Sequence, residues 1–332
     1  MTRVSIALCT YNGERYLDDQ LQSILEQTRK PDELVICDDG STDGTAEVVR
    51  RFIERVPFKV VFLINESNLG STKNFEKAIT QCTGDIIFLA DQDDVWLPQK
   101  IELTESEFNA DENVGLVFSD AELVDGDLRS LNERMWDYSF PLNRRKKAER
   151  SAFYRTLLQA NTVTGATAAF RSKFVQEFVP IPDDVPLLIH DGWLALVISF
   201  MSEVVFINKP LIQYRQHTMQ QIGVNRSDRQ AGITPERLEA GLIESRQHWT
   251  VLDEISKRVH LVPHFVNSRE IEEAIGKNLS FAAGRVIHLE NRSKILNGEG
   301  RRIPIIMREL WTGRYSLYSN GWFSAIKDLI LF

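Results

Sequence analysis

The stretch Phe88-Leu89-Ala90-Asp91-Gln92-Asp93-Asp94-Val95-Trp96 sets three carboxylates directly behind a largely apolar run, residues 85–90, that is typical of a strand. In an extended backbone the side chains at positions i and i+2 point the same way. Asp91 and Asp93 can therefore present hard oxygen ligands to one divalent cation, Mn²⁺ or Mg²⁺, and that cation would bind a diphosphate. The same residues also suit an acidic turn that ends a strand and caps the next helix, because Asp is common at both places.

The chain upstream of this stretch repeats a unit of strand, polar turn and helix. Apolar runs at 4–8, 34–37 and 58–64 are each followed by a polar turn and by apolar residues at helical spacing. Strands that alternate with helices predict an α/β fold, a mostly parallel sheet with helices on both faces. Ligands of such sheets bind at the carboxyl ends of the strands, where the strand order reverses. The turns expected on that edge are Thr10-Tyr11-Asn12-Gly13-Glu14, residues 38–45, Asn68-Leu69-Gly70 and the acidic turn, after which we expect a helix from about Leu97 and a strand over 114–118.

These four motifs, taken in order, resemble family 2 glycosyltransferases, whose nucleotide-sugar-binding domain has the GT-A (Rossmann-like) fold. The resemblance covers roughly residues 3–217 and implies an enzyme that uses a nucleotide diphosphate sugar as donor. Three later motifs are similar to acceptor-side motifs of bacterial members that build surface polysaccharides, rhamnosyltransferases especially. They are Thr164-Gly165-Ala166-Thr167, His190-Asp191-Gly192-Trp193 and Tyr214-Arg215-Gln216-His217.

The donor side has a predicted metal ligand, Asp93. The resemblance implies that Asp91 holds the ribose or supports the ligands, and that His217 completes the metal shell, although His217 also suits a plain polar strand end. The turns are expected to contact the nucleoside, and the start of the third helix suits anions. The predicted donor contacts are Thr10, Asn12, Glu14, Asp39, Asn68, Gly70, Lys73 and Asp91. Residues 38–44 also fit an Asx turn and helix cap, and an exposed lysine is usually solvated.

The acceptor side has a predicted base. Inverting members of the family place a carboxylate at the point of the chain occupied by Asp191, which would take the proton of the acceptor hydroxyl. Trp193 would stack on a sugar face, and Thr164 would contact the acceptor. Alternatively, Asp191 only caps a helix that begins near Gly192. The helix N-terminus would stabilise the carboxylate and lower its basicity.

Length, composition and charge limit the classes of protein to which the chain can belong. The chain has 332 residues, 43% of them hydrophobic, which is enough for one large domain and an appendage. No apolar run reaches the roughly 18 residues that span a bilayer. The chain enters a strand at Val4 without a signal-peptide pattern, so we expect a cytoplasmic protein. The formal charge of −8 argues against nucleic acid as the main partner.

The domain organisation follows from breaks in these patterns. Residues 223–233 interrupt the periodicity, and Thr234-Pro235-Glu236 is typical of a helix start. Arg144-Arg145-Lys146-Lys147, in a linker-like stretch over 137–150, most simply forms a solvated loop. We therefore predict a GT-A domain over 1–225, with a donor half over about 1–120 and an acceptor half over about 121–225. A helical C-terminal extension is predicted over 226–332. Its first helix should run to about Val259, and its second should cover about 268–289.

The C-terminal tail differs in charge from the rest of the chain. Residues 292–332 contain seven basic and three acidic side chains, a net charge of +4. Aromatic residues interleaved with arginine suggest a tail lying on an anionic membrane surface, the inner face of the plasma membrane. The alternative is a helical hairpin that packs its aromatic residues on the catalytic domain. The aromatic residues in question are Trp311, Tyr315, Tyr318, Trp322 and Phe323.

The predicted activity is an inverting, metal-dependent transfer of one sugar to a growing, lipid-linked glycan of the cell surface. By resemblance the first choice of donor is dTDP-rhamnose, with galactose, glucose and N-acetylhexosamine donors open. A nucleotidyltransferase on a similar sheet is disfavoured, because no glycine-rich phosphate loop follows the first strand. An inactive nucleotide-sugar or glycan-binding module is disfavoured, because Asp91, Asp93 and Asp191 are all present.

Overall fold

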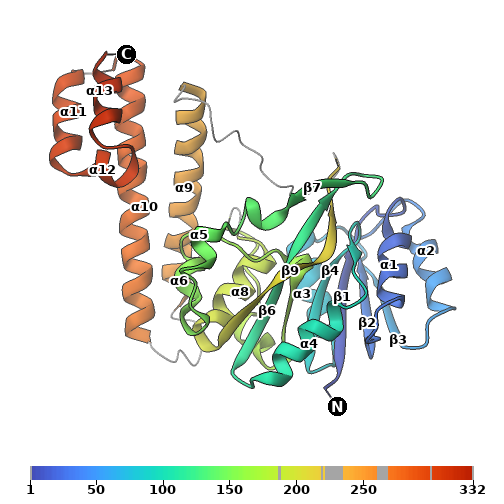
Figure 1. The fold of residues 1–332 in the computed structure, drawn as a ribbon. Helices are drawn as coiled ribbons and strands as arrows, with labels where there is room; N and C mark the ends of the chain where they lie inside the picture. Colours follow the sequence, from blue (N-terminus) through green and yellow to red (C-terminus); the bar gives the residue numbers. More distant parts are fainter. Residues whose placement is uncertain are drawn as a thin grey trace. The chain divides into compact units, whose positions relative to one another are not determined.

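The computed structural model describes residues 2–185, 188–217, 220, 235–259, 268–299 and 301–330. The chain divides into two compact units (Figure 1). The first, called the sheet unit here, comprises Met1–Asp184, Leu188–Arg226 and Val262–Asn267; the second, the helical unit, comprises Val185–Leu187, Ser227–Leu261 and Ser268–Phe332. The predicted domain boundary at residues 225 and 226 and the predicted helix cap at Thr234 lie outside the described residues.

Within the described residues, nine strands form one mixed sheet in the order β3-β2-β1-β4-β8-β6-β9-β5, with β7 paired to β6. The first four strands in this order are parallel, β8 is antiparallel to both its neighbours, and β9 is parallel to β6. The strands are β1 Val4–Thr10, β2 Glu33–Asp38, β3 Lys59–Ile64, β4 Ile86–Asp91, β5 Val95–Trp96, β6 Val114–Val124, β7 Ser130–Arg134, β8 Ala168–Arg171 and β9 Glu203–Arg215. The predicted α/β fold with a mostly parallel sheet is confirmed.

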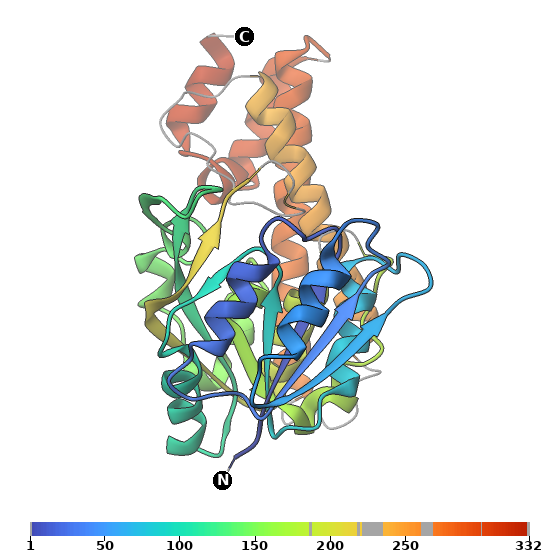
Figure 2. The same cartoon turned by 90° about the vertical axis from the view of Figure 1, so that its right-hand side faces the viewer.

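Strand order explains which helices cover which face. The steps from β1 to β2 and from β2 to β3 run in one direction along the sheet, and the step from β3 to β4 returns across β1. Right-handed crossovers therefore place α1 and α2 on one face and α3 on the other. Figure 2 shows α1 and α2 in front of the strands. The longer helices of this unit are α1 Leu17–Leu25, α2 Thr45–Ile53, α3 Ser71–Gln81, α4 Lys100–Ala110 and α8 His190–Met201.

The central strands are buried because helices cover both faces. Every residue of β1 and β2 is buried, which accounts for the continuous apolar runs in the sequence. The strand order reverses between β1 and β4, so the carboxyl ends of these strands border the position at which parallel sheets bind ligands.

Two predicted element boundaries are wrong for a shared reason. The helix expected from about Leu97 begins at Lys100, because Val95–Trp96 forms β5 and pairs with β9. The strand expected over 114–118 continues to Val124, again paired with β9. Both differences depend on β9, which lies far along the chain.

The stretch over 137–150 is more ordered than a linker. It holds the short helix α5, Leu142–Arg145, next to a buried cluster of aromatic rings. The guanidinium of Arg144 donates to the carbonyls of Thr156 and Ala160. The prediction of a solvated loop is therefore wrong for Arg144, although Lys146 and Lys147 are exposed as expected. The remaining short elements are η1 Met135–Asp137, η2 Arg150–Ala152, α6 Tyr154–Leu157, η3 Gly165–Thr167, η4 Ser172–Phe174 and α7 Val175–Phe178.

The helical unit is built on two long helices that pack on each other, α9 and α10. α10 is longer than predicted and ends at Leu296 rather than near Leu289. Three shorter helices follow. The bounds are α9 Pro235–Arg258, α10 Ser268–Leu296, α11 Arg302–Trp311, α12 Arg314–Tyr318 and α13 Trp322–Ile330. Among the residues described, every helix is too short or too polar to cross a bilayer.

Candidate active site

The acidic turn at the end of β4 lies at the point where the strand order reverses. Asp91 is the last residue of β4, and Asp93 and Asp94 follow in the turn before β5. The pairing of β5 with β9 brings the end of β9 to this turn. His217 Nε2 consequently lies 2.8 Å from Asp93 Oδ2, although the two residues are 124 positions apart in the chain.

Arg215 holds this arrangement together, although no individual role was predicted for it. Its guanidinium is buried and donates to the Asp93 carbonyl at 2.7 Å, the Gly126 carbonyl at 2.7 Å and Asp19 Oδ2 at 2.9 Å. The guanidinium also lies over the ring of Tyr16, 4.5 Å from its centroid. The only signal in the sequence was its place in the motif over 214–217.

Asp94 is the structural member of the acidic turn. It is fully buried, and its Oδ1 accepts a hydrogen bond from the Arg215 backbone N–H at 3.1 Å. Burial, with the nearby charges of Asp93 and Asp91, raises the pKa of Asp94 well above its usual range. Asp94 therefore ties the turn to β9, while Asp93 is left at the edge of the site.

Asp91 is half-buried, and its pKa is raised to about 7, first by burial and then by the negative charges of Asp93 and Asp191. The donor-side and acceptor-side carboxylates share one region of the sheet edge, because the turn at Gly165, which binds Asp191, leads into β8 and β8 pairs with β4. A divalent cation bound there would offset this accumulation of negative charge.

The side chains at this edge fit a divalent cation that is shared with a ligand. The carboxylate of Asp93 and the imidazole of His217 bring two potential ligand atoms together. Over the described part of the chain, no group of three or more His, Cys, Asp or Glu side chains is gathered in a way that would hold a metal by itself. Two protein ligands suit a metal that also takes oxygen atoms from a diphosphate.

The predicted nucleoside contacts meet at the same edge, in the turns after β1, β2 and β3. Thr10 Oγ1 donates to Asp38 Oδ1 at 2.7 Å. Asn12 has a positive φ of 48° and its Oδ1 accepts from the Thr42 N–H at 2.9 Å. Glu14 Oε2 accepts from the Gly44 N–H at 2.9 Å. These bonds join the first turn to the second and leave Asn12 and Glu14 exposed.

Asp39 joins the second turn to the third. Its buried carboxylate accepts hydrogen bonds from the N–H groups of Leu69, at 2.8 Å, and Gly70, at 2.9 Å. Gly70 has a φ of 81°, a conformation that favours glycine, and Asn68 Oδ1 also accepts from its N–H. Lys73 does not point freely into the site, because its ammonium donates to Glu76 and to the Ile181 carbonyl.

On the acceptor side, Asp191 lies in the first turn of α8. Its Oδ2 accepts from the Gly165 N–H at 2.9 Å, and its Oδ1 lies 3.4 Å from Asn161 Nδ2. The N-cap of α8 is Ile189, so the alternative that Asp191 caps a helix starting near Gly192 is wrong. Burial outweighs these hydrogen bonds and raises the pKa of Asp191 to about 6. The expected loss of basicity is therefore also wrong, because desolvation dominates.

The neighbours of Asp191 have different surroundings. Trp193 is only 6% exposed and its Nε1 donates to the Phe178 carbonyl, which leaves little of its ring free to stack on a sugar face as predicted. His190 is stacked on Phe75, with 4.0 Å between ring centroids, and burial lowers its pKa to about 3. Thr164 is partly exposed, just before the turn that binds Asp191.

The strand order of the sheet and the acidic turn at its reversal match the GT-A fold of nucleotide-sugar transferases. The chain belongs to glycosyl transferase family 2, whose model matches residues 5–178. It is 25% identical over 253 residues to an uncharacterized glycosyltransferase of Nostoc sp., covering 74% of each chain.

Two further relatives match a shorter part of the chain. One is the putative glycosyltransferase EpsE of Bacillus subtilis, 33% identical over 100 residues that cover 30% of this chain and 36% of the relative. The other is the UDP-Glc:alpha-D-GlcNAc-diphosphoundecaprenol beta-1,3-glucosyltransferase WfgD of Escherichia coli, 30% identical over 121 residues that cover 36% and 46%. The matched segment thus spans less than half of these two relatives.

Solved structures share the fold. The mannosyltransferase PcManGT from Pyrobaculum calidifontis, in complex with GDP-Man and Mn²⁺, has a TM-score of 0.56 and 17% identity, covering 99% of this chain and 84% of that one. TarS residues 1–349 from S. aureus, in complex with UDP-GlcNAc, has a TM-score of 0.51 and 16% identity, covering 97% and 90%. At these identities the likeness is one of fold.

Proposed function

We propose that this family 2 glycosyltransferase is inverting and metal-dependent, with the donor held at the acidic turn and Asp191 as the catalytic base. The observation that carries the proposal is the hydrogen bond from the Gly165 N–H to Asp191, because the turn at Gly165 leads directly into β8 and β8 pairs with β4, the strand that ends at Asp91. It supports one site in which the base faces the donor end of the sheet. The family membership supports sugar transfer from a nucleotide donor.

On the donor side, Asp93 and His217 would hold the cation, and the cation when bound would stabilise the negative charge of the leaving diphosphate. An imidazole ligand favours Mn²⁺ over Mg²⁺, because Mg²⁺ prefers oxygen ligands. The Mn²⁺ in the structure of PcManGT is consistent with this choice. Thr10, Asn12, Glu14, Asp39, Asn68 and Gly70 line the turns that would contact the nucleoside and its phosphates.

On the acceptor side, the Asp191 carboxylate would take the proton of the acceptor hydroxyl as its oxygen attacks the anomeric carbon. The bond from that carbon to the diphosphate breaks, and the nucleoside diphosphate leaves with the bonding electrons. A pKa raised by burial suits this role, because a base works best when its pKa is near the working pH.

For the substrates, we propose a lipid-linked glycan acceptor in cell-surface polysaccharide synthesis. The name of the WfgD relative includes a diphosphoundecaprenol-linked acceptor, which supports a lipid-linked acceptor here. The resemblance of the motifs over 164–167 and 190–193 to rhamnosyltransferases makes dTDP-rhamnose the first donor to test. We place the protein at the inner face of the plasma membrane, where such acceptors lie.

A donor panel tests the proposal. Purified protein is incubated with dTDP-, UDP- and GDP-sugars and Mn²⁺ or Mg²⁺, and nucleoside diphosphate release and thermal stability are measured. A donor at 100 times its dissociation constant should add about 2.7 kcal/mol of stability, and only with the metal. Release of pyrophosphate instead would indicate nucleotidyl transfer. Binding without turnover under any acceptor condition would indicate an inactive binding module.

A further inference from the structure

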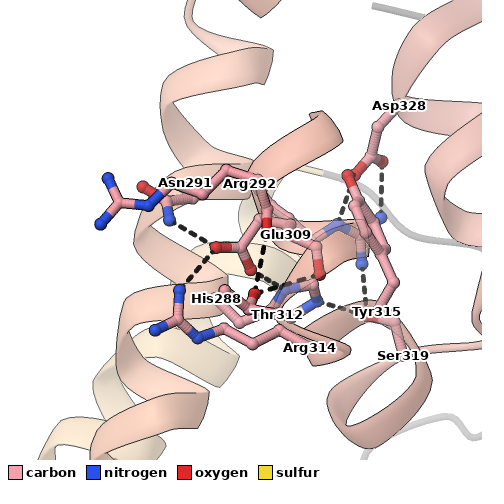
Figure 3. A network of polar contacts seen from close by, with 10 residues as sticks. His288, Asn291, Arg292, Glu309, Thr312, Arg314, Tyr315, Ser319 and Asp328 are labelled. Atoms are coloured by element: carbon pink, nitrogen blue, oxygen red, sulfur yellow. Dashed lines mark hydrogen bonds and ion pairs between the residues drawn. The ribbon is translucent and has the colours of Figure 1, made fainter. Parts of the chain in front are cut away.

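The helical unit holds buried polar groups beside an apolar cluster of Ile295, Ile306, Tyr315 and Ala325. His288, on α10, and Glu309, on α11, are both fully buried, with His288 Nδ1 2.7 Å from Glu309 Oε2. Arg314 donates to the other oxygen of Glu309 at 2.9 Å. Figure 3 shows these side chains converging between the helices, beside a second buried group described next.

The second group fixes α13 to α10. Arg292 donates through Nε and Nη2 to both oxygens of Asp328, at 2.7 and 2.6 Å. Tyr315, also buried, donates its hydroxyl to Asp328 Oδ2 at 2.7 Å (Figure 3). α13 therefore turns its polar and small residues, Ser324, Ala325 and Asp328, toward the interior of the unit.

The opposite faces of α11 and α13 are apolar and exposed. Trp311 is 90% exposed, Trp322 68% and Phe323 79%. Positions four apart on α11 and three to four apart on α13 share one face of each helix. The two helices pack on each other. The exposed apolar residues are Ile303, Met307 and Trp311 on α11 and Trp322, Phe323, Ile326, Leu329 and Ile330 on α13; we call them the apolar face.

This arrangement changes which tail residues matter. Tyr315 belongs to the interior, and Tyr318 packs its ring against Phe281 and His288, so neither is part of the apolar face. Arg314 and Arg292 are neutralised by Glu309 and Asp328. The expectation that Tyr315 lies on a lipid surface is therefore wrong, because its side chain is fully buried.

The positive charge of the tail remains on its surface. With the two internal ion pairs set aside, residues 292–332 keep five basic side chains and one acidic side chain, still a net charge of +4. Arg301, Arg308 and Lys327 are exposed beside the apolar face, and within the described residues none of the three forms an ion pair. Tryptophan and phenylalanine flanked by basic residues match the composition of a water–lipid interface with anionic headgroups.

We propose that α11 and α13 form a preassembled docking face for an anionic lipid bilayer. Trp311, Trp322 and Phe323 enter the boundary between headgroups and acyl chains, and Arg301, Arg308 and Lys327 contact the headgroups. The buried ion pairs hold the two helices so that the apolar face exists before the membrane is met. The inference deepens the proposed function, on which its choice of a membrane partner rests.

Vesicle flotation of the full chain tests this docking face. Vesicles of phosphatidylglycerol and phosphatidylcholine in equal parts are compared with vesicles of phosphatidylcholine alone, at low and high salt. We expect binding to the anionic vesicles only, weakened by salt. Substituting Trp311→Ser, Trp322→Ser and Phe323→Ser should abolish flotation. The matched control, Leu142→Ser with Ile243→Ser and Trp249→Ser, removes exposed apolar residues elsewhere and should float like the wild type.

A charge variant separates the electrostatic part. Arg301→Gln with Arg308→Gln and Lys327→Gln should weaken binding by roughly 100-fold, because each basic residue near an anionic surface contributes about fivefold. Point substitutions are preferable to a truncation of the tail, because cutting the chain after Leu289 would shorten α10 and remove Arg292 with its ion pair. Circular dichroism of each variant should match the wild type, because the substituted side chains lie outside the interior.

Three results would overturn the inference. The first is a wild type that does not bind anionic vesicles at low salt. The second is a variant with Trp311, Trp322 and Phe323 replaced by Ser that floats like the wild type. The third is a wild type that binds no vesicles but forms a dimer in sedimentation velocity, when the same triple variant is a monomer. The Asp93→Ala variant should float normally. A wild type that floats normally but transfers no sugar from any donor would refute the proposed function and leave the docking face standing.

Discussion

Replacing Asp191 by Asn removes the proposed proton acceptor and keeps the shape of the side chain. The amide oxygen of the new residue can still accept the Gly165 N–H, which Asp191 Oδ2 accepts at 2.9 Å. Turnover should fall by roughly 10²–10⁴-fold, the usual contribution of a positioned base. This is about 3 to 5.5 kcal/mol of transition-state stabilisation. Donor affinity should stay close to the wild type, because the acidic turn with Asp93 is unchanged.

The pKa of Asp191 sets the pH dependence of the wild type. With a pKa of about 6, the carboxylate is protonated in acid and cannot accept the acceptor proton. The value of kcat/KM should therefore rise with pH through about 6, and at about pH 5 it should be roughly a tenth of its plateau. In the Asn variant this acidic limb should disappear from whatever activity remains.

The raised pKa of Asp191 also predicts how the stability of the Asp191→Asn variant compares with that of the wild type at different pH values. The folded-state pKa of Asp191 lies above its ordinary value of 3.8, so its contribution to stability is present below about 3.8 and is lost as pH rises through about 6. Above that pH the buried carboxylate costs up to about 3 kcal/mol, a cost that neutral Asn does not incur. The variant should be at least as stable as the wild type near neutral pH, with the difference vanishing in acid.

Transfer rate, donor affinity and thermal stability are measured on the same preparations. Asp32→Asn is the control, because Asp32 accepts the Val4 N–H at the opposite edge of the sheet and should leave turnover unchanged. If Asp191 only holds the turn at Gly165, the Asn variant keeps that bond and stays active. Turnover within about threefold of the wild type would remove Asp191 from the mechanism.

Three further outcomes are expected. Asp93→Ala should abolish turnover and the metal-dependent part of donor binding with the fold intact, whereas full wild-type activity in excess EDTA would contradict the metal site. Arg215→Lys should destabilise the protein by at least about 2 kcal/mol in urea unfolding, because one ammonium cannot replace a guanidinium with three partners; an unchanged midpoint would refute that role. Asp328→Asn should cost about 3–5 kcal/mol by leaving Arg292 buried without a carboxylate, and unchanged hydrogen exchange in α13 would speak against it.

Local sequence patterns were sufficient for the parallel strands β1 to β4 and for the position of the polar turns that follow them, but not for β5, β7, β8 and β9. The apolar runs of β1, β2 and β4 are continuous because both faces of a parallel sheet are covered, and this burial leaves a direct mark on the sequence. The turns follow from the strands. Once the strands are parallel, every turn at a carboxyl end must lie on the same edge, so Thr10, Asp39 and Asp91 could be grouped without coordinates.

The pairs that make the site were decided by tertiary structure. The family resemblance implied that His217 joins the metal shell of Asp93, but the local pattern could not, because the two residues meet through the pairing of the two-residue strand β5 with β9 and two residues are too few to carry a periodic signal. Desolvation depends on everything packed around a group, so the direction of the pKa shift of Asp191 could not be read from its place near a helix N-terminus.

In the C-terminal tail, too, the sequence alone could not predict which residues are buried. An amphipathic helix has two faces, and its sequence does not say which one turns inward. In α13 the polar face is inside because Asp328 pairs with Arg292 on α10, and that choice leaves Trp322 and Phe323 outside. The sequence determined that aromatic and basic residues alternate there. Only the partner across the interface, 36 residues away in the chain, determined which of them reach the surface.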